Sequence, residues 1–270
     1  MLTIDILICS FNKGAVKVDQ VILPPAEGVR YIISYQYTDE RYLEMFPEGL
    51  KHRDDVTIFS YRGQGLSANR NQALSLAKSD IVLFADDDSR IDEGTFETLR
   101  EVFSAHPDMD VAFFQATSYT GRLLKHYPAK ECEVAGPPAD YHLSSIEKAC
   151  RRKSIQGKLR YDERFGLGTQ FLTCGEEDVW VYDAARSKLT MRYFPRKIVE
   201  TNMMLKQSMI YVDAGVQRSY GAFQYYIHGS MAFLHCFFFA FNSMRKGYAH
   251  FFPMLRHMAE GIRYMQQNYQ

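Results

Sequence analysis

The chain has 270 residues, of which 46% are hydrophobic and 24% are charged. This composition excludes a disordered or fibrous protein and is sufficient for one large folded domain or two small ones. Lys plus Arg and Asp plus Glu each number 32, so the formal net charge is zero. A balanced charge argues against a protein that coats nucleic acid.

The cysteines and the N-terminus bear on the cellular compartment. The five cysteines are odd in number and form no CxxC pair, so the sequence predicts neither a disulfide framework nor a thiolate zinc site. The N-terminal stretch MLTIDILICSFNK has no basic leader and no small-residue cleavage site, so we expect a first strand there rather than a signal peptide. Both observations favour the cytoplasm.

Residues 1–116 alternate short apolar runs with helical stretches, which is typical of a mostly parallel sheet with crossover helices. Between the strands we predict a helix beginning at Ser67, whose hydroxyl would cap it, and another helix around Phe96, Leu99 and Phe103. The fold class is therefore α/β. Turn residues bound five predicted strands: Ile4–Cys9, Arg30–Tyr35, Val56–Ser60, Ile81–Ala85 and Val111–Gln115.

The next part of the chain loses this rhythm. Residues 117–174 contain GPP and GLG turns, which predict loops and mixed-sheet strands that form a binding surface over one end of the core. The segment GEEDVWVYDAARSK (175–188) predicts a helix, and a strand is expected near Leu189–Phe194.

The C-terminal part, 206–270, differs in composition from 1–205, so we predict two parts. It carries a net charge of +4 and fifteen Phe or Tyr residues, whereas 1–205 carries −4. Its apolar segment MAFLHCFFFAF is far shorter than the roughly 20 residues of a membrane-spanning helix. Two interpretations stay open: helices packed on the flank of the core, and an interfacial helix on a membrane.

The strongest chemical signal is the run IVLFADDD. Three consecutive carboxylates, Asp86, Asp87 and Asp88, follow a buried strand, at the end where open α/β sheets bind ligands. Adjacent carboxylates repel, and Mg²⁺ or Mn²⁺ bridging the phosphates of a nucleotide diphosphate would neutralise them. The alternative is a set of solvated acids that cap the following helix.

The segment GLSANRNQAL (65–74) is the second signal. Gly65 permits a close turn, and Arg70 and Asn71 project from the first turn of the predicted helix. The Arg70 guanidinium could meet the aspartate cluster or a phosphate, or it could be a surface arginine on an amphipathic helix.

Together with ICSFNK at the end of the first strand, these segments resemble the family 2 glycosyltransferases, which have the Rossmann-like GT-A fold. The family's Tyr-Asn or Phe-Asn turn matches Phe11 and Asn12, its G-L-S-x-x-R-N helix start matches Gly65–Asn71, and its Asp-x-Asp motif matches Asp86–Asp88. The resemblance covers about residues 1–200, and three motifs in the right order are much more specific than any one of them.

The resemblance extends to the segment YDERFGLG followed by GEED, which is similar to the family's acceptor site. There a Glu-Asp pair, here Glu177 and Asp178, opens a helix under the sugar. A carboxylate opposite the leaving diphosphate is what an inverting transfer needs to take the acceptor's proton. Acids at a helix start are also common without any catalytic role, because they complement the helix dipole.

The resemblance implies roles for individual residues. Asp178, with Glu177 beside it, would be the catalytic base, Asp88 and Asp86 would hold Mn²⁺ or Mg²⁺, and the metal would stabilise the leaving diphosphate. The family's second strand often ends in an acidic turn that recognises the base, and here ISYQYTDE leaves Gln36 or Asp39 for that role. The family's histidine near the metal has no counterpart in PRKIVETN, and His228 lies far along the chain. The remaining nucleotide-sugar contacts implied are Ser10, Phe11, Asn12, Gly65, Ser67, Arg70, Asn71, Asp86 and Asp87.

These observations predict a cytoplasmic, metal-dependent, inverting glycosyltransferase that moves a hexose from a nucleotide sugar, with a UDP-sugar as the favoured donor. The acceptor would be a hydroxyl of a saccharide or lipid-linked saccharide in surface polysaccharide assembly, with peripheral contact of the C-terminal part at the inner face of the membrane as a further possibility. Two alternatives are a nucleotidyl or phosphoryl transferase that uses the same aspartates, and a catalytically silent sugar-nucleotide binding subunit.

Overall fold

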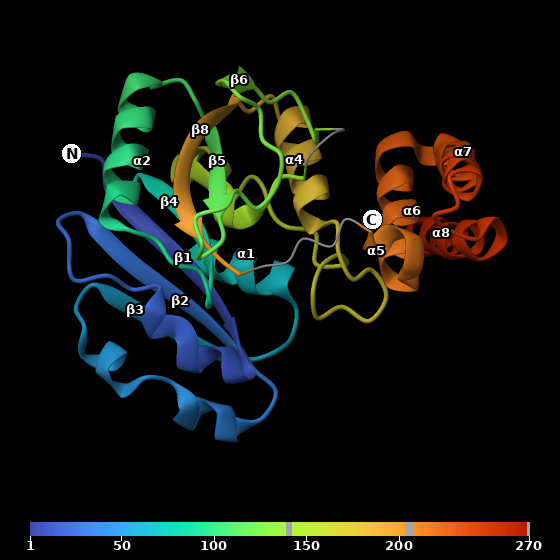
Figure 1. Ribbon diagram of the computed structural model, residues 1–270. Coiled ribbons are helices and arrows are strands. Elements are labelled where there is room, and N and C mark those ends of the chain that lie inside the picture. The colour runs from blue at the N-terminus through green and yellow to red at the C-terminus, as the bar shows by residue number, and fades with distance from the viewer. Residues whose placement is uncertain (139–141, 203–207, 269–270) are drawn as a thin grey trace.

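The computed structural model describes residues 1–138, 142–202 and 208–268. Its centre is an eight-stranded sheet with the order β3-β2-β1-β4-β7-β5-β8-β6 (Figure 1). Strands β1 to β5 and β8 run in one direction, whereas β7 and β6 are antiparallel to their neighbours. The strands are β1 (Ile4–Phe11), β2 (Val29–Tyr37), β3 (Val56–Arg62), β4 (Ile81–Asp86), β5 (Val111–Thr117), β6 (Cys132–Glu133), β7 (Lys148–Arg151) and β8 (Met191–Glu200).

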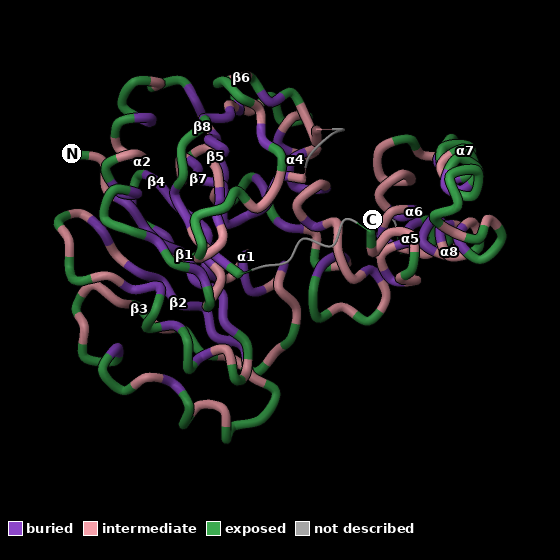
Figure 2. The backbone as a smooth tube through the Cα atoms, viewed as in Figure 1, coloured by how far each residue is buried: buried purple, intermediate pink, exposed green. Residues whose placement is uncertain are grey.

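Helices cover both faces of the sheet. One face packs against α1 (Leu66–Leu76), α3 (Arg152–Ile155) and α4 (Glu176–Arg186). The other packs against α2 (Glu93–Ala105) and the 3₁₀ helices η1 (Asn12–Gln20), η2 (Glu40–Met45) and η3 (Glu48–His52). Because side chains of a strand alternate between faces, strands covered on both sides are mostly apolar, as the buried β1 and β4 show, with Asp5 as the buried charged exception in β1 (Figure 2).

The structure confirms the α/β class and the five predicted N-terminal strands, each of which is one to three residues longer than predicted. The last strand, expected near Leu189–Phe194, begins at Met191 and continues to Glu200. The predicted capping role of Ser67 is wrong. Gly65 is the N-cap of α1, and the Ser67 hydroxyl instead donates a 2.7 Å hydrogen bond to the carbonyl of Phe165.

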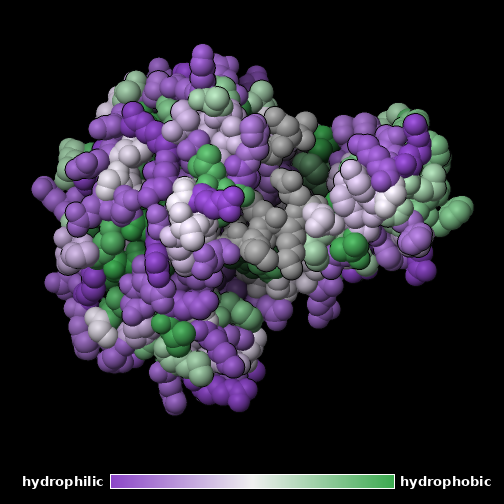
Figure 3. All heavy atoms as spheres, viewed as in Figure 1, coloured by the Kyte–Doolittle hydropathy of each residue, from purple (hydrophilic) through white to green (hydrophobic). Residues whose placement is uncertain are grey.

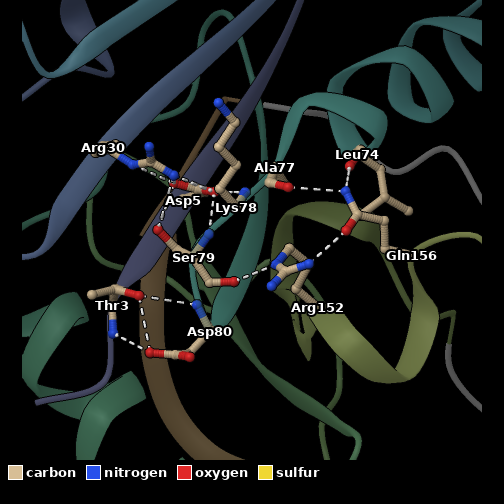
Figure 4. A network of polar contacts seen from close by, with 10 residues as sticks. All are labelled: Thr3, Asp5, Arg30, Leu74, Ala77, Lys78, Ser79, Asp80, Arg152 and Gln156. Atoms are coloured by element: carbon tan, nitrogen blue, oxygen red, sulfur yellow. Dashed lines mark hydrogen bonds and ion pairs between the residues drawn. The ribbon is translucent and has the colours of Figure 1, made fainter.

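A buried aspartate fixes the turn that leads into β4. Both oxygens of Asp5 accept hydrogen bonds: Arg30 donates at 2.9 Å, and the amides of Lys78 and Ser79 donate at 2.6 and 2.8 Å (Figure 4). Arg152 of α3 donates to the Ser79 carbonyl at 2.7 Å. Because this network holds the start of β4, it also helps to set the position of Asp86, the last residue of this six-residue strand.

The C-terminal helices form a lobe beside α4 (Figure 1). Two glycines let the backbones of its longest helices meet: a Cβ on Gly221 would lie 2.0 Å from the Met258 carbonyl oxygen, and one on Gly261 would lie 1.9 Å from that of Arg218. The lobe consists of α5 (Met209–Val212), α6 (Ala214–His228), η5 (Gly229–Met231), α7 (Ala232–Arg245) and α8 (Phe251–Gln267).

The lobe is in contact with the core. Ala222 of α6 and Met265 of α8 share an apolar cluster with Phe165, Leu172 and Val179 of the core. The predicted boundary between residues 205 and 206 lies outside the described residues, so the division into two parts stays a prediction.

One face of the lobe is apolar and exposed (Figure 3). No helix among the described residues combines the length and the apolarity that a membrane crossing requires. We call this exposed, apolar surface of the lobe the α7 face. It consists of Met231, Phe233, Leu234, Phe237, Phe238, Phe241, Met244, Tyr248 and Phe252.

Candidate active site

The aspartates lie at the switch point of the sheet. The chain passes from β1 outward through β2 to β3 and then returns to β4 on the other side of β1, so the strand order reverses at the junction between β1 and β4, the place where open α/β sheets bind ligands. Across it the Ser10 hydroxyl donates a 2.7 Å hydrogen bond to Asp87. A Cβ at position 14 would lie 1.9 Å from the Asp87 carboxylate, so a larger residue than Gly14 would force this carboxylate to shift.

Asp86 and Asp87 have raised pKa values. Burial raises the pKa of Asp86 to about 6, with Glu177, Asp88 and Asp87 adding to the effect and Arg70 opposing it. Burial also raises the pKa of Asp87, while the hydrogen bond from Ser10 lowers it. A cation bound at this strand end would therefore stabilise the ionised forms of both carboxylates, which are costly to keep charged without it.

Asp88 points outward. Its side chain is 51% exposed and lies 3.8 Å from Lys17, while its carbonyl accepts a 2.6 Å hydrogen bond from the Tyr119 hydroxyl. Asp86 and Asp88 thus present one half-buried and one open carboxylate at the same strand end.

The predicted nucleotide contacts at the ends of β1 and β2 form a second group. Asn12 adopts a left-handed backbone with φ of 47°, and its side chain accepts from the Thr38 amide at 2.9 Å. Gln36 is buried and donates to the Tyr61 hydroxyl at 2.8 Å. Phe11 is 40% exposed beside them. The group forms a shelf at the carboxyl ends of β1, β2 and β3.

Two other predicted residues lie away from the carboxylates. Asp39 caps η2 by accepting from the Arg41 amide at 3.0 Å, so its side chain stabilises a local turn. The Asn71 amide is engaged at both ends with Tyr161, donating to its carbonyl at 2.9 Å and accepting from its amide at 2.8 Å. The structure therefore gives Asn71 a positioning contact with the segment before α4 and does not bring it to Asp86.

Arg70 is the centre of the site. The alternative of a surface arginine is wrong, because the side chain is only 5% exposed. Its Nη1 lies 3.1 Å from Glu176 and 3.0 Å from Glu177, and its Nη2 lies 3.8 Å from Asp86. Burial alone would lower the pKa of Arg70, but the charge of Glu177 and its neighbours raises it well above the ordinary value. A permanent cation thus joins the end of β4 to the start of α4.

The acids that open α4 differ in their environments. Burial raises the pKa of Glu176 to about 7, with Glu177 adding to the effect and Arg70 opposing it. Burial would do the same to Glu177, but the charges of Arg70 and His142 lower its pKa far below the ordinary value. Asp178 is the most accessible of the three, with 32% of its side chain exposed against 13% for Glu177 and 6% for Glu176.

His142 joins this group and was not found from the sequence, where it stands alone without a motif. Its Nδ1 lies 3.4 Å from Asp178 and its Nε2 lies 3.5 Å from Glu177, so the two carboxylates converge on one ring. Burial disfavours the imidazolium, but bonding to Asp178 and Glu177 raises the pKa of His142 well above its ordinary value. Lys125, itself in a buried 2.8 Å ion pair with Glu147, donates to the His142 carbonyl and so holds the backbone of His142.

A second buried network that the sequence did not reveal lies beneath the acids. Lys148 is 1% exposed, donates to the Tyr161 hydroxyl at 2.7 Å and lies 3.3 Å from the centre of the Trp180 ring. Burial lowers its pKa to about 7. The Tyr161 hydroxyl is also 2.6 Å from that of Ser145, whose amide donates to Glu177 at 3.4 Å. Through Tyr161 and Ser145, these contacts hold the Glu177 carboxylate in position.

A cavity of about 470 Å³ connects these groups. Asp86, Arg70, His142 and the three acids of α4 line it from the core, and residues of α5 and α6 line it from the lobe. The predicted site residues Asp86, Arg70, Glu177 and Asp178 are therefore neighbours in space, although 106 positions separate Arg70 from the start of α4 at Glu176.

The donor set also shows which kind of metal site these residues suit. Among the described residues, no three His, Cys, Asp or Glu side chains are grouped as a protein-only metal cage would require. Mg²⁺ and similar hard cations commonly use one or two carboxylates together with substrate phosphates. Asp86 and Asp88 fit that arrangement, with the remaining ligands supplied by a diphosphate and water.

His228, the distant histidine considered for the metal, does not belong to this site. It ends α6 and stacks on His235, with ring centres 4.0 Å apart.

Comparison with known proteins identifies a family. The sequence model described as "Glycosyl transferase family 2" matches residues 37–172, about half of the chain. This range includes the DDD run and the GLSANRN segment. No curated protein sequence matches the chain significantly.

Solved structures with a similar fold include S. aureus TarS. The structure of TarS 1–349 has a TM-score of 0.61 and 11% identity, covering 100% of this chain and 93% of that one. The same fragment in complex with UDP-GlcNAc has a TM-score of 0.56 at 11% identity, covering 100% and 93%. A longer TarS structure has a TM-score of 0.57 and 15% identity over 83% of this chain, and the match covers 40% of that longer chain. These likenesses show that the fold is shared.

Proposed function

The chain belongs to glycosyl transferase family 2 and is a glycosyltransferase, and from this premise we propose that it transfers a hexose from a nucleoside diphosphate sugar to an acceptor hydroxyl with inversion. One observation carries the proposal: a single cavity holds Asp86 from the end of β4 and Asp178 from the start of α4. A donor on the first and an acceptor beside the second would place the leaving group and the base on opposite sides of the anomeric carbon.

UDP is the nucleotide we propose. TarS 1–349 has been solved with UDP and with UDP-GlcNAc, and it shares the fold of this chain. The shelf of Phe11, Asn12 and Gln36 lies at the strand ends where a base would sit, and Gln36 with Tyr61 offers polar groups to it. Ser10 and Asp87 lie between the shelf and the aspartates.

In this proposal Asp178 removes the proton from the acceptor hydroxyl as the oxygen attacks. It is accessible from the cavity, whereas Glu177 is held by Arg70, His142 and the Ser145 amide. Glu177 therefore orients the site, and Asp178, which also contacts His142 but has the more exposed side chain, faces the acceptor. Before the acceptor binds, His142 in its cationic form stabilises the adjacent carboxylates of Glu177 and Asp178.

Asp86 and Asp88 would hold Mn²⁺ or Mg²⁺ in the proposed enzyme. When bound together with the diphosphate, such an ion stabilises the negative charge of the leaving group. Burial keeps Asp86 costly to ionise by itself, which favours joint binding of cation and nucleotide over binding of either alone.

A thermal-shift panel of nucleoside diphosphates and their sugars, with and without Mn²⁺, tests the function. A ligand at one hundred times its dissociation constant stabilises a protein by about 2.7 kcal/mol. Stabilisation by UDP and a UDP-sugar that requires Mn²⁺, followed by release of UDP on turnover, is the expected result. Release of pyrophosphate would favour the nucleotidyl transferase, and binding with no turnover of any donor would favour a silent subunit.

The first prediction concerns metal-dependent binding of the donor nucleotide. We expect Asp88→Asn to reduce UDP affinity in Mn²⁺ to the level seen without metal, because a neutral amide is a poor ligand for a hard cation. Asp88 is half exposed, so the fold should be unaffected. Titration calorimetry of both proteins with and without Mn²⁺ measures this.

Asp19→Asn is the matched control, since Asp19 is an exposed carboxylate on η1. It should bind UDP like the wild type. An Asp88→Asn variant with full metal-dependent affinity would show that Asp88 is a solvated acid and that the cation site lies elsewhere.

We propose further that the α7 face contacts the anionic inner surface of the membrane, which places the enzyme at the cytoplasmic side. The face is apolar, and Arg245 and Lys246 lie at its edge. Between Asp213 and Glu260 the sequence has no acidic residue. An apolar face with a basic rim is the chemistry of an interfacial helix on anionic lipid. All five cysteines are free thiols, which also suits the cytoplasm.

The second prediction tests this contact by co-sedimentation with vesicles. The wild type should bind vesicles containing anionic lipid more than neutral ones, with binding that falls as salt rises. Arg245→Gln with Lys246→Gln should lose most of the difference, whereas Lys158→Gln with Arg160→Gln, exposed cations of the core, should not. Equal recovery with both lipids, or none, would remove the membrane contact, and a dimer in sedimentation velocity would assign the face to a second copy.

A further inference from the structure

The wall that the C-terminal lobe gives to the active-site cavity is mostly apolar. From the acids of α4 the cavity continues to α5 and α6, and Leu66, Ile146 and Leu167 of the core complete its wall. Leu167 is 67% exposed at the tip of the GLG turn, where the flanking glycines have φ of 110° and 90°. The lobe side of the cavity consists of Met209, Ile210, Val216, Ser219, Tyr220 and Phe223.

Tyr220 brings a hydroxyl to the lobe side of the cavity, and two other polar groups nearby, Ser219 and Asp213, are already engaged. The Ser219 hydroxyl donates to the Gly215 carbonyl at 2.9 Å and accepts from the Cys174 amide at 3.3 Å. Asp213 accepts from the Val216 amide at 2.8 Å and serves as the cap of α6. A saccharide buried here would place most of its hydroxyl groups against the apolar side chains of Met209, Ile210, Val216 and Phe223, which is costly, whereas an alkyl group would gain from the burial.

We propose that the acceptor is an amphiphile whose apolar part occupies the α5–α6 side of the cavity while its hydroxyl faces Asp178. The inference rests on the proposed function and narrows its acceptor from any saccharide to one with an apolar substituent near the accepting group. The argument for this occupant is continuity: the apolar wall and the acids line one cavity, so a molecule that reaches Asp178 from this side passes the apolar residues.

The test compares n-octyl β-glucoside, below its critical micelle concentration, with methyl β-glucoside. Both carry the same sugar. Binding to the full chain saturated with UDP and Mn²⁺ is followed by calorimetry, and the octyl compound should bind at least about ten-fold more tightly, because burying each methylene contributes about 0.8 kcal/mol. Ile210→Asn and, separately, Val216→Asn should remove most of this preference.

Two measurements keep the result interpretable. Phe238, on the α7 face, is 55% exposed. Phe238→Ser should leave the preference for the octyl compound intact, and this result would exclude binding of the detergent to the α7 face. The UDP affinity of each variant reports whether the variant is folded and has an intact donor site. If the wild type itself does not bind UDP, the proposed function is overturned and not the acceptor class. Equal affinity for the two glucosides, or an octyl preference that persists in both cavity variants, would overturn the inference.

Discussion

Asp178→Asn is expected to lower sugar transfer by about two to four orders of magnitude, the usual range of general-base catalysis. The amide keeps the shape of the carboxylate but cannot accept the acceptor's proton. Donor affinity should change little, because Asp178 opens α4 while the proposed diphosphate ligands end β4. The measurement is UDP release with the best donor of a UDP-sugar panel, paired with UDP affinity.

Two variants of the same helix make the result specific. Asp183→Asn changes a carboxylate that accepts from the Tyr226 hydroxyl outside the cavity, and it should transfer sugar at the wild-type rate. Glu177→Gln should be less active than wild type and less stable, because it weakens the contact with Arg70. Near-normal transfer by Asp178→Asn together with an inactive but stable Glu177→Gln would move the base by one residue.

Arg70→Met should lower the free energy of unfolding by about 3–5 kcal/mol, the usual cost of removing one member of a buried ion pair. The substitution leaves Glu177, Glu176 and Asp86 without their shared cation. The loss should be smaller at pH 5 than at pH 8, since removing the cation raises the carboxyl pKa values and protonation at low pH then relieves the repulsion. Urea denaturation at both pH values measures it.

Arg160→Met is the matched control for this prediction. Arg160 forms an ion pair of 3.0 Å with Glu163, but its side chain is 73% exposed. Such surface pairs contribute about 0–1 kcal/mol, so the control should remain near wild-type stability. If Arg70→Met lost as little stability as Arg160→Met, water would have to reach the cluster of acids around Arg70. Arg70 would then not join the two halves of the site.

Much of the site could be predicted from the sequence, for a physical reason. A buried parallel strand that ends in acids must present them at the carboxyl edge of the sheet, so IVLFADDD alone places Asp86 where ligands bind. The order of the motifs then indicated the family, and the helix at GEED followed from its composition. The metal-binding and catalytic roles of these residues stay predictions.

Only the tertiary structure decided which groups meet. Position 70 is equally consistent with a surface or a buried arginine until α4 places Glu176 and Glu177 against it. His142 and Lys148 carry no motif, because their environment consists of residues from distant segments. The composition of the tail showed that it is apolar and basic, but only the packing of α6 against α8 and α4 shows which apolar side chains are buried in the lobe, which line the cavity and which remain exposed. Local patterns fix what each segment presents, and long-range packing fixes what each side chain faces.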